Sequence, residues 1–237
     1  MNTRAPGAIQ PDTKTGGAPL RTVPSLHGLI VRVIGAVLVM GSVAGAAETD
    51  AGTAGGTVAI GKLAPDFALA GIDGNTHSLS AHKGKFIVLE WNNWDCPFVK
   101  KHYASGNMQG LQKTYRDKGV VWITVCSSAP GKQGHYEAGE QRKRFEQNRS
   151  AATAYVLDPD GKVGRAYAAK TTPHMFVIDP EGILIYGGAI DDKPSTKTAD
   201  VEGAKNFVRA CLDAALAGKP VESKTNAPYG CSVKYKN

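Results

Sequence analysis

The sequence predicts an α/β fold with a mixed central β-sheet and helices on both faces. Two apolar runs, at residues 85–91 and 120–125, have the length and composition of buried parallel strands. Helical spacing follows each run, and the pattern then changes to two strands around a turn and a closing helix. Alternation followed by an antiparallel pair is typical of a mixed sheet covered on both sides.

The individual elements can be assigned in order from residue 60 onward. The run 85–91 (KFIVLEW) is followed by Cys96, which we expect to begin a helix with Pro97 in its first turn. Residues 158–161 (DPDG) have the composition of a turn. The remaining elements are expected as helix 108–118, strand 120–125, polar helix 137–148, strand 154–157, helix 163–169, hairpin strands 175–178 and 183–190, and closing helix 200–217.

The two ends of the 237-residue chain differ from this folded core. Basic residues up to Arg32 precede an apolar run at 33–43 and small residues at 44–47, which are the three parts of a secretory signal. The run is shorter than the roughly 20 residues that span a bilayer. We therefore expect a signal over 1–46, with an uncleaved membrane anchor as the alternative, and a periplasmic or secreted protein. The other expected segments are a flexible linker 47–59, a folded domain 60–217 and a polar tail 218–237 that carries Cys231.

Composition excludes several classes of partner. The formal net charge is +7, but the basic residues are scattered and do not alternate with aromatic residues, so no nucleic-acid partner is expected. The four cysteines form no Cys-x-x-Cys motif, which removes support for structural zinc. The turn at 158–161 lacks calcium ligands, because Lys162 and Ala169 stand where oxygen donors are required. We expect no cofactor.

The chemically informative segment is Glu90 to Tyr103 (EWNNWDCPFVKKHY). A cysteine between a buried strand and a helix meets the positive end of the helix and its free N–H groups, and both favour the thiolate. Lys100 and Lys101, one turn later, would add to that field. The alternative is a buried, inert Cys96, although its polar neighbours Asn92, Asn93 and Asp95 favour a reactive thiol.

This segment resembles the active-site loop of the thioredoxin superfamily. Residues 60–217 as a whole resemble its redoxin branch, the alkyl hydroperoxide reductase/thiol-specific antioxidant-like proteins. Trp91 and Trp94 precede Cys96-Pro97-Phe98-Val99 as a Trp-rich loop precedes Cys-x-x-Cys in thioredoxins, and Glu90 stands where thioredoxin has a buried acid. The resemblance implies a thioredoxin-like fold, Cys96 as nucleophile, Trp94 and Pro97 beside the substrate, and a proton-holding role for Glu90. A strand acid facing solvent is the alternative for Glu90.

A second family mark is the segment 171–176 (TTPHMF). Proteins with this fold carry a cis-proline before the hairpin, so the resemblance implies a cis Thr172-Pro173 bond facing Cys96. The Thr172 backbone would then pair with the extended chain of a substrate. His174 is either a proton donor at the site or simply a packed histidine.

Two departures from the family pattern affect the expected chemistry. Val99 replaces the second cysteine of Cys-x-x-Cys, and Leu89 and Asn93 replace the proline and threonine of the peroxiredoxin motif. A resolving thiol must therefore come from elsewhere in the chain or from an external molecule. Cys231 is the first candidate, because the 13 residues from 218 to 231 span about 43 Å when extended, against a domain radius of gyration of roughly 15–16 Å. Cys126, at a neighbouring strand end, is the alternative, and Cys211 belongs to the apolar face of a helix.

The sequence thus predicts an exported thiol oxidoreductase with peroxiredoxin-like antioxidant character. Its partners would be a protein or small-molecule disulfide, or a hydroperoxide, and an external thiol reductant. A thioredoxin-fold copper chaperone is an alternative, with Cys96, His102 and His174 as ligands, although Lys100 stands where such chaperones have their second cysteine. A non-catalytic domain that binds extended peptides beside Pro173 is the other alternative.

Overall fold

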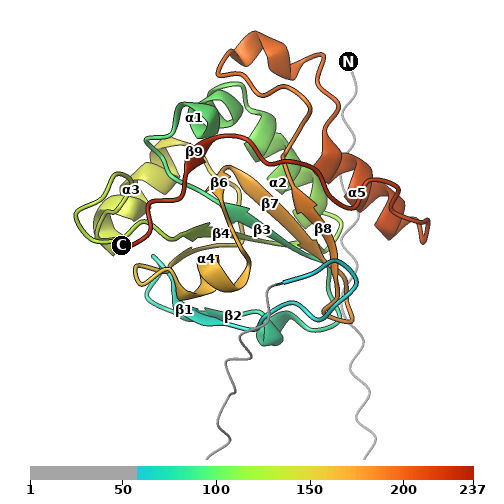
Figure 1. The fold of residues 1–237 in the computed structure, drawn as a ribbon, viewed down its shortest axis with the longest axis horizontal. Coiled ribbons are helices and arrows are strands. Elements are labelled where there is room, and N and C mark those ends of the chain that lie inside the picture. The colour runs from blue at the N-terminus through green and yellow to red at the C-terminus, as the bar shows by residue number, and fades with distance from the viewer. Residues whose placement is uncertain (1–57) are drawn as a thin grey trace, which may run out of the picture. The chain divides into compact units, whose positions relative to one another are not determined.

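The computed structural model describes residues 58–237, which form a thioredoxin-like fold (Figure 1). The expected signal over 1–46 and most of the expected linker lie outside the described residues. Within residues 58–237, no helix combines the length and the apolar character needed to cross a membrane.

The central sheet has five strands in the order β5-β4-β3-β7-β8, and it is mixed, as predicted. Strand β3 (Ile87–Trp91) lies in the middle, parallel to β4 (Val121–Cys126) and antiparallel to β7 (His174–Ile178). Strand β5 (Ala154–Leu157) pairs with β4 on one side, and β8 (Leu184–Gly188) pairs with β7 on the other. Every residue of β3, β4 and β7 is buried, which explains their continuous apolar runs.

Helices and a small hairpin cover the two faces of this sheet (Figure 1). Side chains that alternate along the strands divide into two cores, one containing Val88 and Trp122 and the other Leu89 and Ile123. The first core is covered by α1 (Pro97–Ala104), α2 (Asn107–Arg116), α3 (Ala138–Gln147) and α5 (Phe207–Leu216). The second is covered by α4 (Lys162–Ala166) and the segment that carries β1 (Ala68–Ala70) and β2 (Thr76–Ser78).

The start of the closing helix differs from the prediction. A 3₁₀ turn occupies Thr198–Val201, and α5 begins only at Phe207. Asn206 caps it, since its side-chain oxygen accepts a hydrogen bond from the Arg209 N–H at 2.9 Å. The cap provides a defined helix start that the apolar spacing over 200–217 did not reveal.

Residues 218–237, here called the tail, are bound along the domain. Residues 217–220 are exposed, and the chain then runs past β8, where the Gly187 N–H donates to the Lys224 carbonyl at 3.0 Å. It ends with β9 (Cys231–Ser232), which pairs antiparallel with β6 (Thr171–Thr172). Figure 1 shows this segment in red, crossing the molecule from α5 to β6.

Candidate functional site

Cys96 occupies the junction between β3 and α1. It is the N-cap residue of α1, with Pro97 at the first helical position, as the sequence predicts. Its side chain is 0% exposed, and its sulfur donates a hydrogen bond to the Thr172 carbonyl oxygen at 3.0 Å. The thiol therefore lies at the positive end of the helix and donates its proton to a carbonyl on another strand.

The carbonyl that faces Cys96 belongs to a cis peptide unit. The Thr172-Pro173 bond is cis, as the resemblance implies. Thr172 is buried at the end of β6, directly before β7, and β7 pairs with β3 along its whole length. This topology brings the Thr172 backbone over the end of β3, beside the thiol of Cys96.

Cys231 is the third part of the site. In the β6–β9 pair it lies directly opposite Thr172, and its side chain contacts that of Cys96. Burial and then contact with the Cys96 side chain raise the pKa of Cys231 to about 11, although Lys234 acts in the opposite direction. The structure thus joins Cys96, Thr172 and Cys231 from three elements that are distant in the sequence.

The other two cysteines have different surroundings. Cys126, at the end of β4, donates to the Gly134 carbonyl at 3.5 Å and accepts from the Gln141 amide at 3.8 Å, and burial raises its pKa. Cys211 faces the core from α5, where burial raises its pKa to about 12. Both groups are held as protonated thiols by their burial.

Glu90 is a buried acid in a polar network, so the solvent-facing alternative is wrong. Its carboxylate is 0% exposed and accepts hydrogen bonds from the Tyr103 hydroxyl and the Trp122 indole, both at 2.9 Å. Further donors are the side chains of Asn92, Gln112 and Thr124. Burial raises the pKa of Glu90, and the hydrogen bonds only partly offset it. The network reaches Cys96 through α1, which carries Tyr103 two turns after the cysteine.

Trp94, which the resemblance places beside the substrate, is buried in the structure. Its side chain is 3% exposed, and its ring lies in the core against Tyr103 and Tyr155, with centroids 4.9 and 5.6 Å away. Trp94 can influence the site only through this packing. Pro97, by contrast, is exposed at the start of α1, beside the buried Cys96.

His174 has the features of a packed histidine. It is 6% exposed, its Nδ1 accepts from the Lys170 N–H at 3.2 Å, and its ring lies 4.4 Å from that of Phe176. Burial lowers the pKa of His174 to about 4, so the imidazole is neutral at neutral pH. It lines a cavity of about 600 Å³ together with Lys170 and Thr171.

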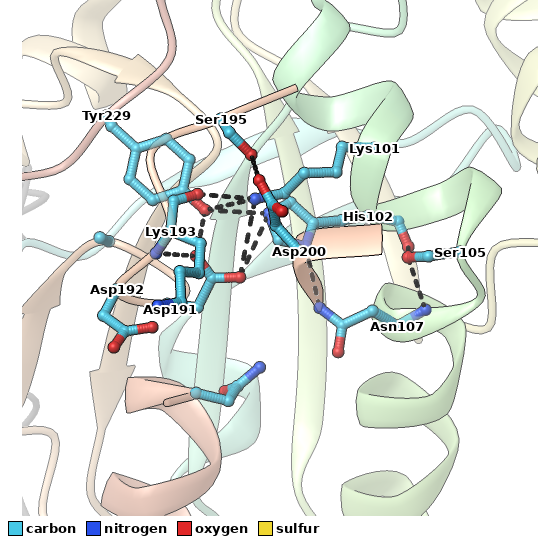
Figure 2. Close-up of polar contacts among 12 residues, drawn as sticks. Lys101, His102, Ser105, Asn107, Asp191, Asp192, Lys193, Ser195, Asp200 and Tyr229 are labelled. Atoms are coloured by element: carbon cyan, nitrogen blue, oxygen red, sulfur yellow. Dashed lines mark hydrogen bonds and ion pairs between the residues drawn. The ribbon is translucent and has the colours of Figure 1, made fainter. Parts of the chain in front are cut away.

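The sequence did not reveal a buried polar cluster beside the site, formed by Lys101, His102, Asp191 and Tyr229. We call it the clasp (Figure 2). The Lys101 Nζ donates to the Lys193 carbonyl at 2.7 Å and lies 3.8 Å from Asp191 Oδ2. Tyr229 donates its hydroxyl hydrogen to Asp191 Oδ1. The clasp therefore ties α1, which starts at Cys96, to the tail two residues before Cys231.

His102 belongs to the clasp and not to a metal site. Its Nδ1 accepts from the Asn107 amide at 2.9 Å, and its Nε2 lies 3.1 Å from the Tyr229 hydroxyl. Burial lowers the pKa of His102 to about 3. Within residues 58–237, no group of three or more His, Cys, Asp or Glu side chains is arranged to hold a metal ion. The geometry gives no support to the copper-chaperone alternative.

The sequence is similar to those of known thiol–disulfide oxidoreductases and thioredoxin-like proteins. The chain is 28% identical over 129 residues to thiol-disulfide oxidoreductase ResA of Geobacillus thermodenitrificans, covering 53% of this chain and 66%, just under two thirds, of ResA. It is 27% identical over 145 residues to thioredoxin-like protein YneN of Bacillus subtilis, covering 60% of this chain and 79% of YneN.

Two solved structures and a family model complete the comparison. An uncharacterized conserved protein from Geobacillus kaustophilus is 30% identical with a TM-score of 0.66, covering 76% of this chain and 94% of that one. Hypothetical protein SMc02350 from Sinorhizobium meliloti shares the fold, with 23% identity, a TM-score of 0.65 and coverage of 76% and 97%. The model of the AhpC/TSA family matches residues 60–187, more than half of the chain, and the chain belongs to this family.

Proposed function

We propose that the protein is a thiol–disulfide oxidoreductase in which Cys96 is the nucleophile and Cys231 is the resolving thiol. The observation that carries this proposal is the contact between the two thiols beside the Thr172 carbonyl. Cys96 donates to the Thr172 oxygen, and Cys231 lies opposite Thr172 in the β6–β9 pair. The similarity to ResA supports the same class of reaction.

The reaction proceeds in two exchange steps. The Cys96 thiolate attacks one sulfur of a partner disulfide, the partner S–S bond breaks, and the departing thiolate takes up a proton. The Cys231 thiolate then attacks the Cys96 sulfur, so that the Cys96–Cys231 disulfide forms and the second partner thiol leaves. Two electrons pass to the partner, and an external thiol reductant restores the dithiol.

The pKa of Cys231 gives these steps an order. Contact with Cys96 is one of the causes that raise the pKa of Cys231. Once Cys96 is part of a mixed disulfide, it has no ionisable proton, and the charge repulsion between the two sulfurs disappears. Cys231 therefore becomes a better nucleophile only after Cys96 has reacted, while Cys96 has the positive end of α1 beside it from the start.

A hydroperoxide is the second candidate oxidant, favoured by the match to the AhpC/TSA family. In that case the Cys96 thiolate attacks the peroxide, giving a sulfenic acid and water or an alcohol. Cys231 then condenses with the sulfenic acid, forming the same disulfide and one water.

The cellular setting we propose is outside the cytoplasm. A signal-like sequence over 1–46 and a redox pair suited to an oxidising compartment support it. Fractionation of cells that express the full chain tests this setting, because recovery with cytoplasmic marker enzymes would contradict it.

Mass spectrometry of the reduced protein treated with oxidised glutathione or hydrogen peroxide tests the chemistry. We expect oxidised glutathione to give a Cys96–Cys231 disulfide, and hydrogen peroxide to give the same disulfide if a hydroperoxide is also a substrate. Cys96→Ser should abolish the reaction, and Cys231→Ser should stop at a glutathione adduct or a sulfenic acid on residue 96. Cys211→Ser, in the core of α5, is the matched control and should behave as the parent. Disulfide formation that survives in Cys96→Ser would contradict the proposal.

A further inference from the structure

The cavity of about 600 Å³ that His174 lines lies between the domain and the tail. Tail residues 225–228 form one of its walls, and neither of the two thiols of the proposed site lines it. Its floor consists of buried apolar side chains of the second core, Tyr167, Phe176 and Leu184. Small-molecule sites in proteins typically have a volume of this order and an apolar lining with a few polar groups.

His174 provides a hydrogen-bond donor in this cavity. Its Nδ1 accepts from the Lys170 N–H at 3.2 Å, and a ring nitrogen that accepts carries no proton. Because the imidazole is neutral, its proton is on Nε2. Within residues 58–237, this Nε2–H has no hydrogen-bond partner, although the side chain is only 6% exposed. A molecule in the cavity can therefore accept a hydrogen bond from a buried donor that is otherwise unpaired.

The lining of the cavity also carries positive charge. Lys170 is the only charged residue among the described residues that line it. Burial and then the charge of Lys170 lower the pKa of His174, so the ammonium group lies near the imidazole. An N–H donor close to an ammonium group suits an anionic oxygen, while the apolar floor suits a hydrocarbon group.

We propose that this cavity is a binding site for a small carboxylic acid with an apolar body. The carboxylate accepts the hydrogen bond from His174 Nε2 and lies near the ammonium group of Lys170. The apolar body packs on the floor formed by the second core. This inference goes beyond the proposed function, because the site is separate from Cys96 and Cys231.

Binding in this cavity is linked to docking of the tail. A molecule that contacts both the domain and residues 225–228 favours the docked tail by a factor that grows with its concentration relative to its Kd. Cys231 of the docked tail contacts Cys96, which is buried. The bound acid should therefore slow alkylation of Cys96, about tenfold when its concentration is about ten times its Kd.

NMR spectroscopy of the full chain, with labelled histidine, tests the chemical class of the ligand. The imidazole signals of His174 are identified by their absence from His174→Phe. Decanoate, which joins a carboxylate to a hydrocarbon chain, should shift these signals until a single site is saturated. Decanol lacks the carboxylate and acetate lacks the chain, so each should bind at least about tenfold more weakly.

Substitutions test the two polar groups by calorimetry with decanoate. His174→Phe keeps an aromatic ring but removes the donor, and it should weaken binding about tenfold. Lys170→Gln changes an exposed side chain and keeps the imidazole, so it tests the site even if His174→Phe does not fold. It should weaken binding about threefold. Lys162→Gln, in α4 but outside the cavity, is the matched control and should bind as the parent does.

Three results would overturn the inference. They are His174 signals that decanoate leaves unchanged, equal binding of decanol and decanoate, and equal affinity of Lys170→Gln and Lys162→Gln. The first result would have this meaning whether the cavity stays empty or is filled by the part of the chain before Val58. A Cys96 alkylation rate that decanoate does not change would overturn the link to the tail. None of these measurements uses disulfide exchange, so the proposed function and this inference can fail separately.

Discussion

The two facing cysteines are held by very different kinds of structure. Cys96 follows β3, which is buried at every residue and pairs with a strand on each side over five residues. Cys231 lies in β9, which has two residues and one neighbouring strand. In a Cys-x-x-Cys protein both thiols would belong to one helix, but here the buried Val99 occupies the second place. The proposed nucleophile thus follows a core strand, whereas the proposed resolving thiol lies in a short strand at the end of the tail.

The largest expected effect is on global stability, when a disulfide links the tail covalently to the domain. Oxidation of Cys96 and Cys231 closes a loop of about 135 residues, and the entropy lost from the unfolded chain should stabilise the protein by about 5 kcal/mol. Urea unfolding with and without a thiol reductant measures the change. Cys231→Ser, which cannot close the loop, should show no such dependence. Equal stability of the two redox states in the parent protein would contradict the pairing.

A pair of core substitutions compares the two anchorages directly. Leu89→Ala, in the middle of β3, should cost about 3 kcal/mol of global unfolding free energy, because it leaves a cavity in a closed core. Val233→Ala, in the tail, should change global stability by less than about 1 kcal/mol and should instead slow disulfide closure. Chemical unfolding and quenched mass spectrometry give the two readouts. Val233 packs in the second core, and a similar global loss for both variants would mean that the tail unfolds together with the domain.

The clasp offers a smaller and more local way to loosen the tail. Tyr229→Phe removes the hydroxyl that donates to Asp191 and should make tail docking about 1.5 kcal/mol less favourable. Alkylation of Cys96 should then be about tenfold faster. Tyr115→Phe is the control, since it removes a buried tyrosine's hydroxyl bond to an aspartate, here Asp213 at 2.9 Å, that is not part of the clasp. An increase of the same size in Tyr115→Phe would show that general destabilisation is responsible.

The smallest expected effect is a change in the titration of Cys231. Its raised pKa, about 11, means that less thiolate is present at neutral pH, so alkylation should be slow and should speed up as the pH rises toward 11. Cys96→Ala removes the contribution of the neighbouring sulfur but leaves burial, which is the larger cause. The pKa should therefore fall but stay above the usual thiol value. The rate of Cys231 alkylation at several pH values, followed by mass spectrometry, measures this pKa. An unchanged pKa in Cys96→Ala would contradict the contact between the two thiols.

The sequence predicted the central part of this arrangement well. Strands β3 and β4, the helix that starts at Cys96 and the hairpin around 179–182 follow from apolar runs and turn residues that act locally. The resemblance supplied the cis bond before Pro173. The reach of Cys231 could be argued from chain length alone, which gives a radius but not a docking position.

The remaining features depend on long-range contacts that leave no periodic pattern. Strands β6 and β9 have two residues each, too few to show alternation. The clasp joins Lys101, Asp191 and Tyr229 across the fold. Taken singly, each is a polar residue that sequence reasoning would place on the surface. Trp94 was placed beside the substrate by analogy, but two tyrosines of the core enclose its ring.

The exposed residues 217–220, between α5 and the tail, are accessible to proteases. A single proteolytic cut there would break the backbone between the domain and Cys231, so that only noncovalent contacts would hold the tail. If the cut tail then dissociated, the molecule would keep Cys96 but would lack Cys231, the proposed resolving thiol. In the proposed reaction it would then accumulate as mixed disulfides between Cys96 and its partners. Cleavage of one peptide bond would thus convert a catalyst into a protein that reacts only once.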